Sequence, residues 1–200
     1  MNRQTTLRLS AAAFAALGLF LFAQGAWIPV KAVIAQVLLE RAFTETVATG
    51  KPVKPWSWAD TWPVARISVP RLSRSAIALE GASGQAMAFG PAHLAESANA
   101  GEPGTAVYAA HRDTHFAFLG DVKPGDDITV TRADGRQFSY VMTGSEVVRW
   151  DQSGITVDAR GYQLALATCW PLDGKTHGPL RYVVHAVMKN EVAANGAIRR

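Results

Sequence analysis

Residues 162–171 read YQLALATCWP, and Cys169 within this stretch is the only cysteine in a chain of 200 residues. Side chains alternate in size up to the cysteine, as in a β-strand, where they point to opposite faces in turn. The face that ends at the sulfur carries Gln163, Ala165 and Ala167, and the other carries Tyr162, Leu164, Leu166 and Thr168. The bulkier face predicts a barrel core. The smaller face leaves room either for a substrate groove or for a covering helix over an inert thiol.

A second apolar run, LRYVVHAVMK at residues 180–189, follows the loop after the cysteine, and Arg181 stands at its beginning. If the two runs pair as a hairpin, Arg181 lies beside Cys169. A guanidinium there would favour the thiolate and hold a substrate oxyanion. The alternative is an arginine that only binds loop carbonyls.

The histidine favoured as a partner for the thiol is His111, which ends the predicted strand GTAVYAAH at residues 104–111. Strand ends and the loops after them are natural places for catalytic groups, and a cysteine nucleophile needs an imidazole for proton transfer. The competing histidines are His93, His115, His177 and His185. Scattered histidines and a single cysteine lack zinc-site spacing. With no phosphate-binding glycine loop either, we expect neither a metal nor a cofactor.

Short apolar runs separated by turn signals such as ADG, KPGDD and DQSG fill residues 64–190. This pattern predicts a mainly β fold, a closed barrel of about eight strands with short helices in its connections. The helices are expected within residues 84–95 and 114–122. Pro70 limits the first run to an edge or kinked strand.

The N-terminal residues 1–30 contain an apolar run from Leu9 to Val30, preceded by Arg3 and Arg8. About 20 apolar residues suffice to span a bilayer, and positive flanks stay in the cytoplasm. We therefore expect a single-pass membrane anchor, with the N-terminus cytoplasmic and the barrel outside the cytoplasm. A signal peptide cleaved near Ala23-Gln24-Gly25 is the alternative. We favour the anchor because apolar residues continue beyond the possible cleavage site.

The segment between anchor and barrel, residues 31–63, is expected to form a helix over 31–48 and then a linker rich in Pro and Trp. Residues 191–200 are expected to be a tail. A net charge of +4 without a dense basic run argues against nucleic-acid binding. Since exported proteins normally pair their cysteines, an unpaired Cys169 is an intermolecular linker, an inert residue or a reactive thiol.

Three elements together resemble the sortases, the membrane-anchored cysteine transpeptidases. They are HRDTHFAFL with VKPGDDI at residues 111–128, the stretch Ala165-Leu166-Ala167-Thr168-Cys169, and the downstream Arg181. The family hallmark is Thr-Leu-x-Thr-Cys, so this chain departs from it at Ala165, a change that bears on groove shape. The N-terminal stretch and KPWSWADTWPVARI resemble the Gram-negative branch of the family, class GN, whose members typically serve one dedicated target protein.

The resemblance implies a sortase-like barrel and a mechanism. Cys169 would cleave an LPxTG-like sorting signal at the C-terminus of a secreted protein, forming a thioester. His111 would move protons and Arg181 would stabilise the oxyanion. An amine acceptor at the cell envelope would complete the transfer.

Further site residues are expected around these three. Ala165, Ala167, Thr168 and Trp170 are candidates to bind substrate, although the face parity of Thr168 also suits the core. Asp113 would either orient His111 or serve as a turn residue.

Other functions stay open at this point. A papain-like or NlpC-type peptidase is disfavoured, because its cysteine precedes its histidine and begins a helix. A cysteine peptidase that only hydrolyses, or a membrane-tethered binding module with an inert buried thiol, remains an alternative.

Overall fold

The structure, a computed structural model, describes residues 3–81, 84–176 and 178–189. The predicted tail at 191–200 and the candidate His177 lie outside these residues. The chain divides into two compact units that meet between Leu38 and Leu39.

The first unit is the greater part of helix α1 (Arg3–Thr49), which is continuous through the predicted helix at 31–48. Within the described part of the chain, no helical segment combines the length and the hydropathy that a bilayer crossing requires.

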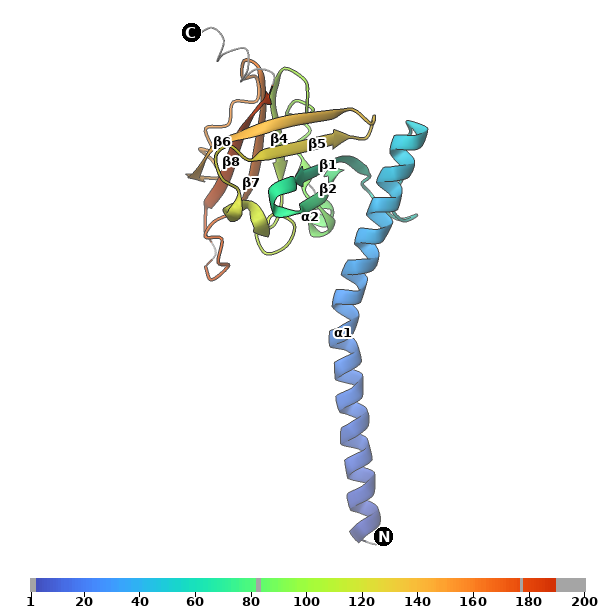
Figure 1. Cartoon of the computed structure of the whole chain (residues 1–200). Coiled ribbons are helices and arrows are strands. Elements are labelled where there is room, and N and C mark those ends of the chain that lie inside the picture. Colours follow the sequence, from blue (N-terminus) through green and yellow to red (C-terminus); the bar gives the residue numbers. More distant parts are fainter. Residues whose placement is uncertain (1–2, 82–83, 177, 190–200) are drawn as a thin grey trace. The chain divides into compact units, whose positions relative to one another are not determined.

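The second unit is a closed barrel of eight strands among the described residues, in the order β1-β2-β3-β4-β7-β8-β6-β5 (Figure 1). The strands are β1 (Pro63–Val69), β2 (Arg74–Glu80), β3 (Ala92–His93), β4 (Gly104–Ala109), β5 (Asp127–Arg132), β6 (Gln137–Arg149), β7 (Tyr162–Cys169) and β8 (Leu180–Met188). The connections hold α2 (Gly84–Phe89) and two 3₁₀ turns, η1 (Pro70–Leu72) and η2 (Ala117–Asp121). The prediction of a closed, mainly β barrel is confirmed.

The bulky face of β7 points into the barrel, as its alternation predicted. Leu164 and Leu166 are buried in the main core together with residues of other strands, among them Ile67, Tyr140 and Val184. Burying one such leucine contributes about 1.5–3 kcal/mol. The opposite face of β7 packs outside the barrel in a separate small apolar cluster that includes Ala165.

The predicted helical connection at 84–95 is wrong in its second half. Helix α2 ends at Phe89, and Ala92–His93 form β3, which pairs with β2 and β4. Gly90 explains the change, because a Cβ there would lie 2.4 Å from the carbonyl oxygen of Ile77 on β2. This close approach returns the chain to the sheet.

The first strand also differs from the expectation in part. Pro70 ends β1 by beginning the turn η1. However, β1 pairs with both β2 and β5 and is therefore not an edge strand. In a closed barrel a proline cannot donate to a neighbouring strand from the middle of β1. Pro70 therefore stands just after the strand, where its missing N–H breaks no ladder bond.

The Pro- and Trp-rich linker packs on the barrel. Thr61 donates a hydrogen bond to the carbonyl of Glu80 at 2.8 Å, and the amide of Glu80 donates to the carbonyl of Trp62 at 3.0 Å. The ring of Trp56 packs edge-on against Phe89 of α2, with 4.8 Å between centroids. The linker thereby supports α2 from outside.

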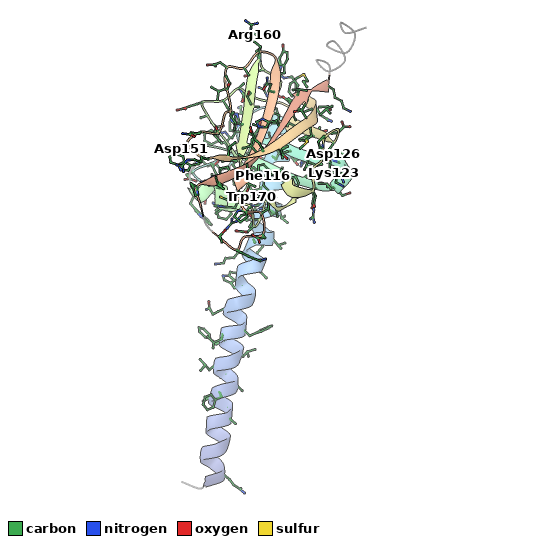
Figure 2. The ribbon with its side chains drawn as sticks, turned by 90° about the vertical axis from the view of Figure 1, so that its left-hand side faces the viewer. Phe116, Lys123, Asp126, Asp151, Arg160 and Trp170 are labelled. Atoms are coloured by element: carbon green, nitrogen blue, oxygen red, sulfur yellow. The ribbon has the colours of Figure 1, made fainter. Side chains whose placement is uncertain are left out.

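The turn KPGDD before β5 is built around the buried carboxylate of Asp126. It accepts hydrogen bonds from Arg71 Nε at 2.5 Å, Arg71 Nη2 at 2.6 Å and the amide of Lys123 at 2.7 Å. Figure 2 shows Lys123 and Asp126 together at this turn. The Arg71 hydrogen bonds hold the pKa of Asp126 below its ordinary value. The turn therefore ties η1 to β5.

We predict that Asp126→Asn lowers Tm at pH 7 by roughly 3–6 °C, because losing hydrogen bonds to a charged group costs about 1.5 kcal/mol or more. A lowered folded-state pKa stabilises the protein above the ordinary carboxyl pKa of about 4, and this contribution is lost as the pH falls through the folded value. The Tm difference should therefore be full at pH 6–7 and narrow below about pH 4. Thermal melts across this range, with the exposed Asp60→Asn as control, measure it. A difference that stays constant down to pH 2.5 contradicts the assignment.

Candidate active site

The β7–β8 hairpin places Arg181 directly opposite Cys169 in the strand register, as predicted. Arg181 Nη1 donates to the carbonyls of Leu180 at 2.9 Å and Gly178 at 3.3 Å. These carbonyls hold one nitrogen of the guanidinium. The planar fork carries further N–H donors beside the sulfur.

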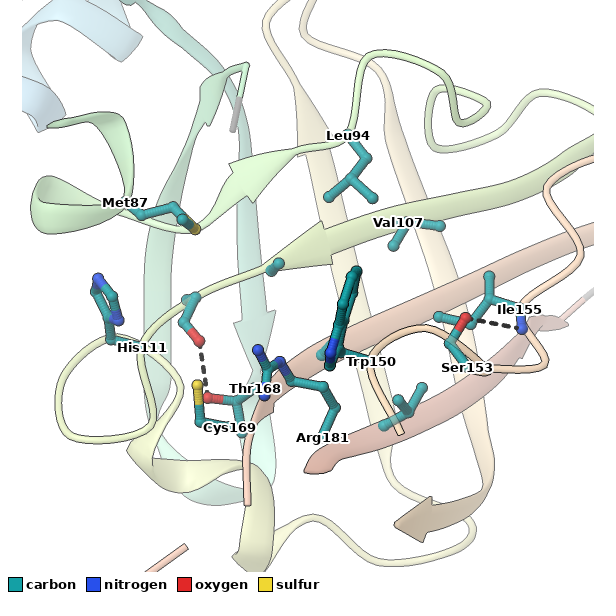
Figure 3. Close-up of a pocket in the computed structure, with 14 residues that line it drawn as sticks. Met87, Leu94, Val107, His111, Trp150, Ser153, Ile155, Thr168, Cys169 and Arg181 are labelled. Carbon is teal, nitrogen blue, oxygen red and sulfur yellow. Dashed lines mark hydrogen bonds between the residues drawn. The ribbon is translucent and has the colours of Figure 1, made fainter. Parts of the chain in front are cut away.

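Parallel pairing between β4 and β7 brings His111 to the same end of the barrel. Ala109 lies opposite Ala167, and the amide of Ala110 donates to the carbonyl of Ala167 at 3.1 Å. The buried hydroxyl of Thr168 donates to the carbonyl of Ala110 at 2.7 Å. Because His111 follows directly, these bonds place it beside Cys169. Figure 3 shows the sulfur with the imidazole on one side and the guanidinium on the other.

Two hollows open onto the sulfur. The apolar hollow, of about 360 Å³, is lined by Met87, Leu94, Val107, Ala109, Ala110, His111, Trp150, Ser153, Ile155, Ala167, Thr168, Cys169, Arg181 and Val183. The charged hollow, of about 350 Å³, is lined by His111, Arg112, Asp113, Cys169, Gly178 and Arg181. Cys169, His111 and Arg181 belong to both. Both hollows therefore give access to the sulfur of Cys169.

The predicted substrate-binding residues on β7 differ in whether they reach the apolar hollow. Ala167 and Thr168 line the apolar hollow. Ala165 is completely buried beneath it, in a cluster with Val107 and Val183. The departure from the family hallmark at Ala165 thus falls in the packing under the groove.

Trp170 lines neither hollow. It lies one residue beyond Cys169, and its ring stacks on Tyr182 with 5.9 Å between centroids. The hydroxyl of Tyr182 in turn donates to Ser145 Oγ at 2.8 Å. Trp170 thereby packs against the β8 side of the hairpin.

Asp113 lines the charged hollow with an exposed carboxylate. Its Oδ1 lies 3.5 Å from Arg112 Nε. In the part of the chain that the structure describes, no hydrogen bond joins Asp113 to His111. The structure therefore pairs this aspartate with Arg112.

The other described histidines lie outside the two hollows. His93 is buried, and its Nε2 hydrogen-bonds the carbonyl of Ala98 at 3.1 Å. His185 pairs with Glu146 at 2.9 Å. Burial lowers the pKa of His115, and a hydrogen bond with the backbone of Ala88 opposes this effect only in part. His111 is the described histidine that shares a hollow with the thiol.

Sequence reasoning missed several residues of the site. The walls of the apolar hollow come partly from connections, with Met87 on α2 and Trp150, Ser153 and Ile155 after β6. Such residues carry no periodic signal. The sequence analysis also gave no role to Arg112, which directly follows His111 and binds the loop after Cys169. No group of three or more His, Cys, Asp or Glu residues suited to a metal occurs among the described residues.

Comparison with known proteins agrees with this geometry. The family model described as "Sortase domain" matches residues 67–189. Sortase D of Bacillus subtilis (strain 168) is 28% identical over 120 residues, 60% of this chain and 60% of that protein. The matched region thus spans about 60% of the length of this curated relative.

Solved structures show the same fold. Sortase E of Streptomyces avermitilis superposes with a TM-score of 0.54 at 28% identity, covering 64% of this chain and 88% of that one. A sortase D5 transpeptidase of Clostridium perfringens has a TM-score of 0.61 at 19% identity, covering 78% and 98%. Because the matched family model covers more than half of the sequence and encloses His111, Cys169 and Arg181, the chain belongs to the sortase family.

Proposed function

We propose that the protein is a cysteine transpeptidase that cleaves an LPxTG-like sorting signal on a secreted protein and transfers the product to an amine. The observation that carries this proposal is the convergence of Cys169, His111 and Arg181 around two hollows that share one sulfur (Figure 3).

In the first half-reaction the Cys169 thiolate attacks the backbone carbonyl carbon of the Thr in the signal, and the bond from this carbon to the next residue is the one that breaks. The developing oxyanion is stabilised by the N–H groups of Arg181 other than those on Nη1, which two loop carbonyls hold. His111, as imidazolium, protonates the departing amine while the C–N bond breaks. The product is a thioester, with the acyl chain on the sulfur.

In the second half-reaction an acceptor amine attacks the thioester carbon. The neutral His111 removes the proton from the amine, the C–S bond breaks, and the thiolate is regenerated. The charged hollow supports this step, because Cys169 lines it as well as the apolar hollow. The apolar hollow supports a signal with apolar side chains, since most of its lining is aliphatic or aromatic.

Two observations disfavour the alternatives. An inert buried thiol is disfavoured because Cys169 is only partly buried and lines both hollows. The charged hollow beside the same sulfur supports transfer to an amine over hydrolysis alone, because it offers room for an acceptor.

We predict that Cys169→Ala and His111→Ala abolish cleavage of an LPxTG-like peptide. Arg181→Ala should lower kcat by about 10²–10³, the usual effect of losing an oxyanion donor. Mass spectrometry of peptide incubated with a small primary amine would measure both cleavage and transfer. His185→Ala is the matched control, because this histidine pairs with Glu146 outside the site. Unchanged cleavage in all three site variants would overturn the proposal.

The thiol itself offers an independent test. We expect iodoacetamide to alkylate Cys169 in the folded protein, with a rate that rises with pH, because the thiolate is the reactive form. Mass spectrometry with and without denaturant follows the reaction. A thiol that reacts only after denaturation would support the binding-module alternative instead.

We further propose that residues 1–30 anchor the protein in the inner membrane with the barrel in the periplasm. The apolar run from Leu9 to Val30 and the preceding Arg3 and Arg8 support this arrangement. The resemblance to the class GN branch supports one dedicated substrate protein. A neighbouring reading frame ending in a sorting motif, an apolar helix and a basic tail would identify it.

On this proposal, we predict that the full chain stays in the membrane pellet after alkaline carbonate washing, because the apolar run from Leu9 to Val30 would lie in the bilayer. A chain beginning at Lys31 is the control and should be released. An N-terminus near Ala26 in the mature protein, found by sequencing, would show instead that a signal peptide is removed.

A further inference from the structure

Arg112 is a buried cation next to the catalytic histidine. Only 4% of its side chain is exposed. Its Nη1 donates to the carbonyl of Pro171 at 2.8 Å, and its Nη2 donates to the carbonyl of Gly174 at 3.3 Å. Pro171 lies two residues after Cys169. One guanidinium thus bridges the segment that carries the imidazole and the segment that carries the thiol.

The loop that accepts these bonds is shaped to meet the His111 segment. The amide of Gly174 donates to the carbonyl of Pro171 at 3.3 Å, which closes a turn. Gly174 has a φ of +72°, and a Cβ there would lie 2.9 Å from Asp113 Oδ1. A second close approach between the two segments is at Gly120, where a Cβ would lie 2.7 Å from Leu172 Cδ1. The two segments therefore touch closely along several residues.

A second link joins the same two segments closer to the core. It is the hydrogen bond from Thr168 Oγ1 to the carbonyl of Ala110 at 2.7 Å. Thr168 and Ala110 directly precede Cys169 and His111, whereas Arg112 and Pro171 follow them. The catalytic pair is thus held between one bridge on its N-terminal side and one on its C-terminal side.

We propose that Arg112 is a positioning residue that fixes the imidazole of His111 relative to the sulfur of Cys169. The inference rests on the proposed transpeptidase function. Two of its nitrogens donate to protein carbonyls and its Nε lies 3.5 Å from Asp113 Oδ1, so it acts through the geometry of the pair. Proton transfer between a bound leaving group and an imidazole is sensitive to such geometry, and a misplacement of about 1 Å can cost about 100-fold in rate.

The planar fork explains why an arginine occupies this position. Two carbonyls from residues three apart accept bonds from two different nitrogens of one rigid group. A lysine ammonium is a compact point charge on a flexible stem and does not reproduce the fixed two-pronged geometry. Charge alone is therefore not expected to substitute for Arg112.

The test compares Arg112→Met and Arg112→Lys with Arg132→Met. Arg132 is a matched control, because its Nη1 donates to the carbonyl of Ala100 and to Glu102 and it lines neither hollow. Steady-state cleavage of the LPxTG-like peptide gives kcat and KM, and thermal melts give Tm. We expect kcat of Arg112→Met to fall by about 100-fold with KM changed less than about threefold. Arg112→Lys should fall between the wild type and Arg112→Met, and Arg132→Met should lower Tm without lowering kcat.

If Arg112→Met fails to fold, a further variant, Gly174→Ala, tests whether the Arg112 bridge positions the catalytic pair. It keeps Arg112 but puts an L side chain at a φ of +72°, which strains the turn whose carbonyls accept the Arg112 bonds, so a lowered kcat at unchanged KM supports the bridge. Wild-type kcat in whichever of these variants is folded overturns the inference, as does an equal loss of kcat in Arg132→Met. Failure of the proposed function is separate, because the wild-type protein would then not cleave the peptide at all.

Discussion

The buried hydrogen bond from the Thr168 hydroxyl to the carbonyl of Ala110 joins the two strand ends on which the site depends. It lies at the point where the parallel pairing of β4 and β7 stops, so it extends the register by one residue on each side. Both groups are removed from water, and a buried donor or acceptor without a hydrogen-bond partner costs about 1–3 kcal/mol of stability. The bond between them avoids this cost. This constraint places His111 and Cys169 together from segments far apart in the chain.

Strand β7 serves both the core and the site because its two faces differ. Leu164 and Leu166 fill the barrel, and this packing fixes the register of the strand. A slip by one residue would turn Cys169 inward. The opposite face ends in Ala167 and Cys169, and the small alanine leaves space for the apolar hollow. Stability of the core and access to the sulfur are therefore coupled through one alternating sequence.

Much of this arrangement was predictable from local pattern. Alternation in β7 divided core from groove, and the hairpin to β8 put Arg181 opposite Cys169 as expected. The position of Trp170 could not be predicted from alternation, because β7 ends at Cys169. The Trp170 ring stacks on Tyr182 instead. The expectation for 84–95 failed because a close backbone contact at Gly90, invisible in the local sequence, returns the chain to the sheet.

The alternation of most strands, the nucleophile candidate and the order of histidine, cysteine and arginine can be read from the amino-acid sequence alone. These depend on alternation, on residue type and on spacing along the chain, which are local properties. The folded barrel was needed to show that the three side chains surround two hollows, that Asp113 pairs with Arg112, and that Arg112 binds the loop after the cysteine. These features depend on parallel pairing between β4 and β7 and on buried contacts between connections, for which residues distant in sequence must first be brought together by barrel closure.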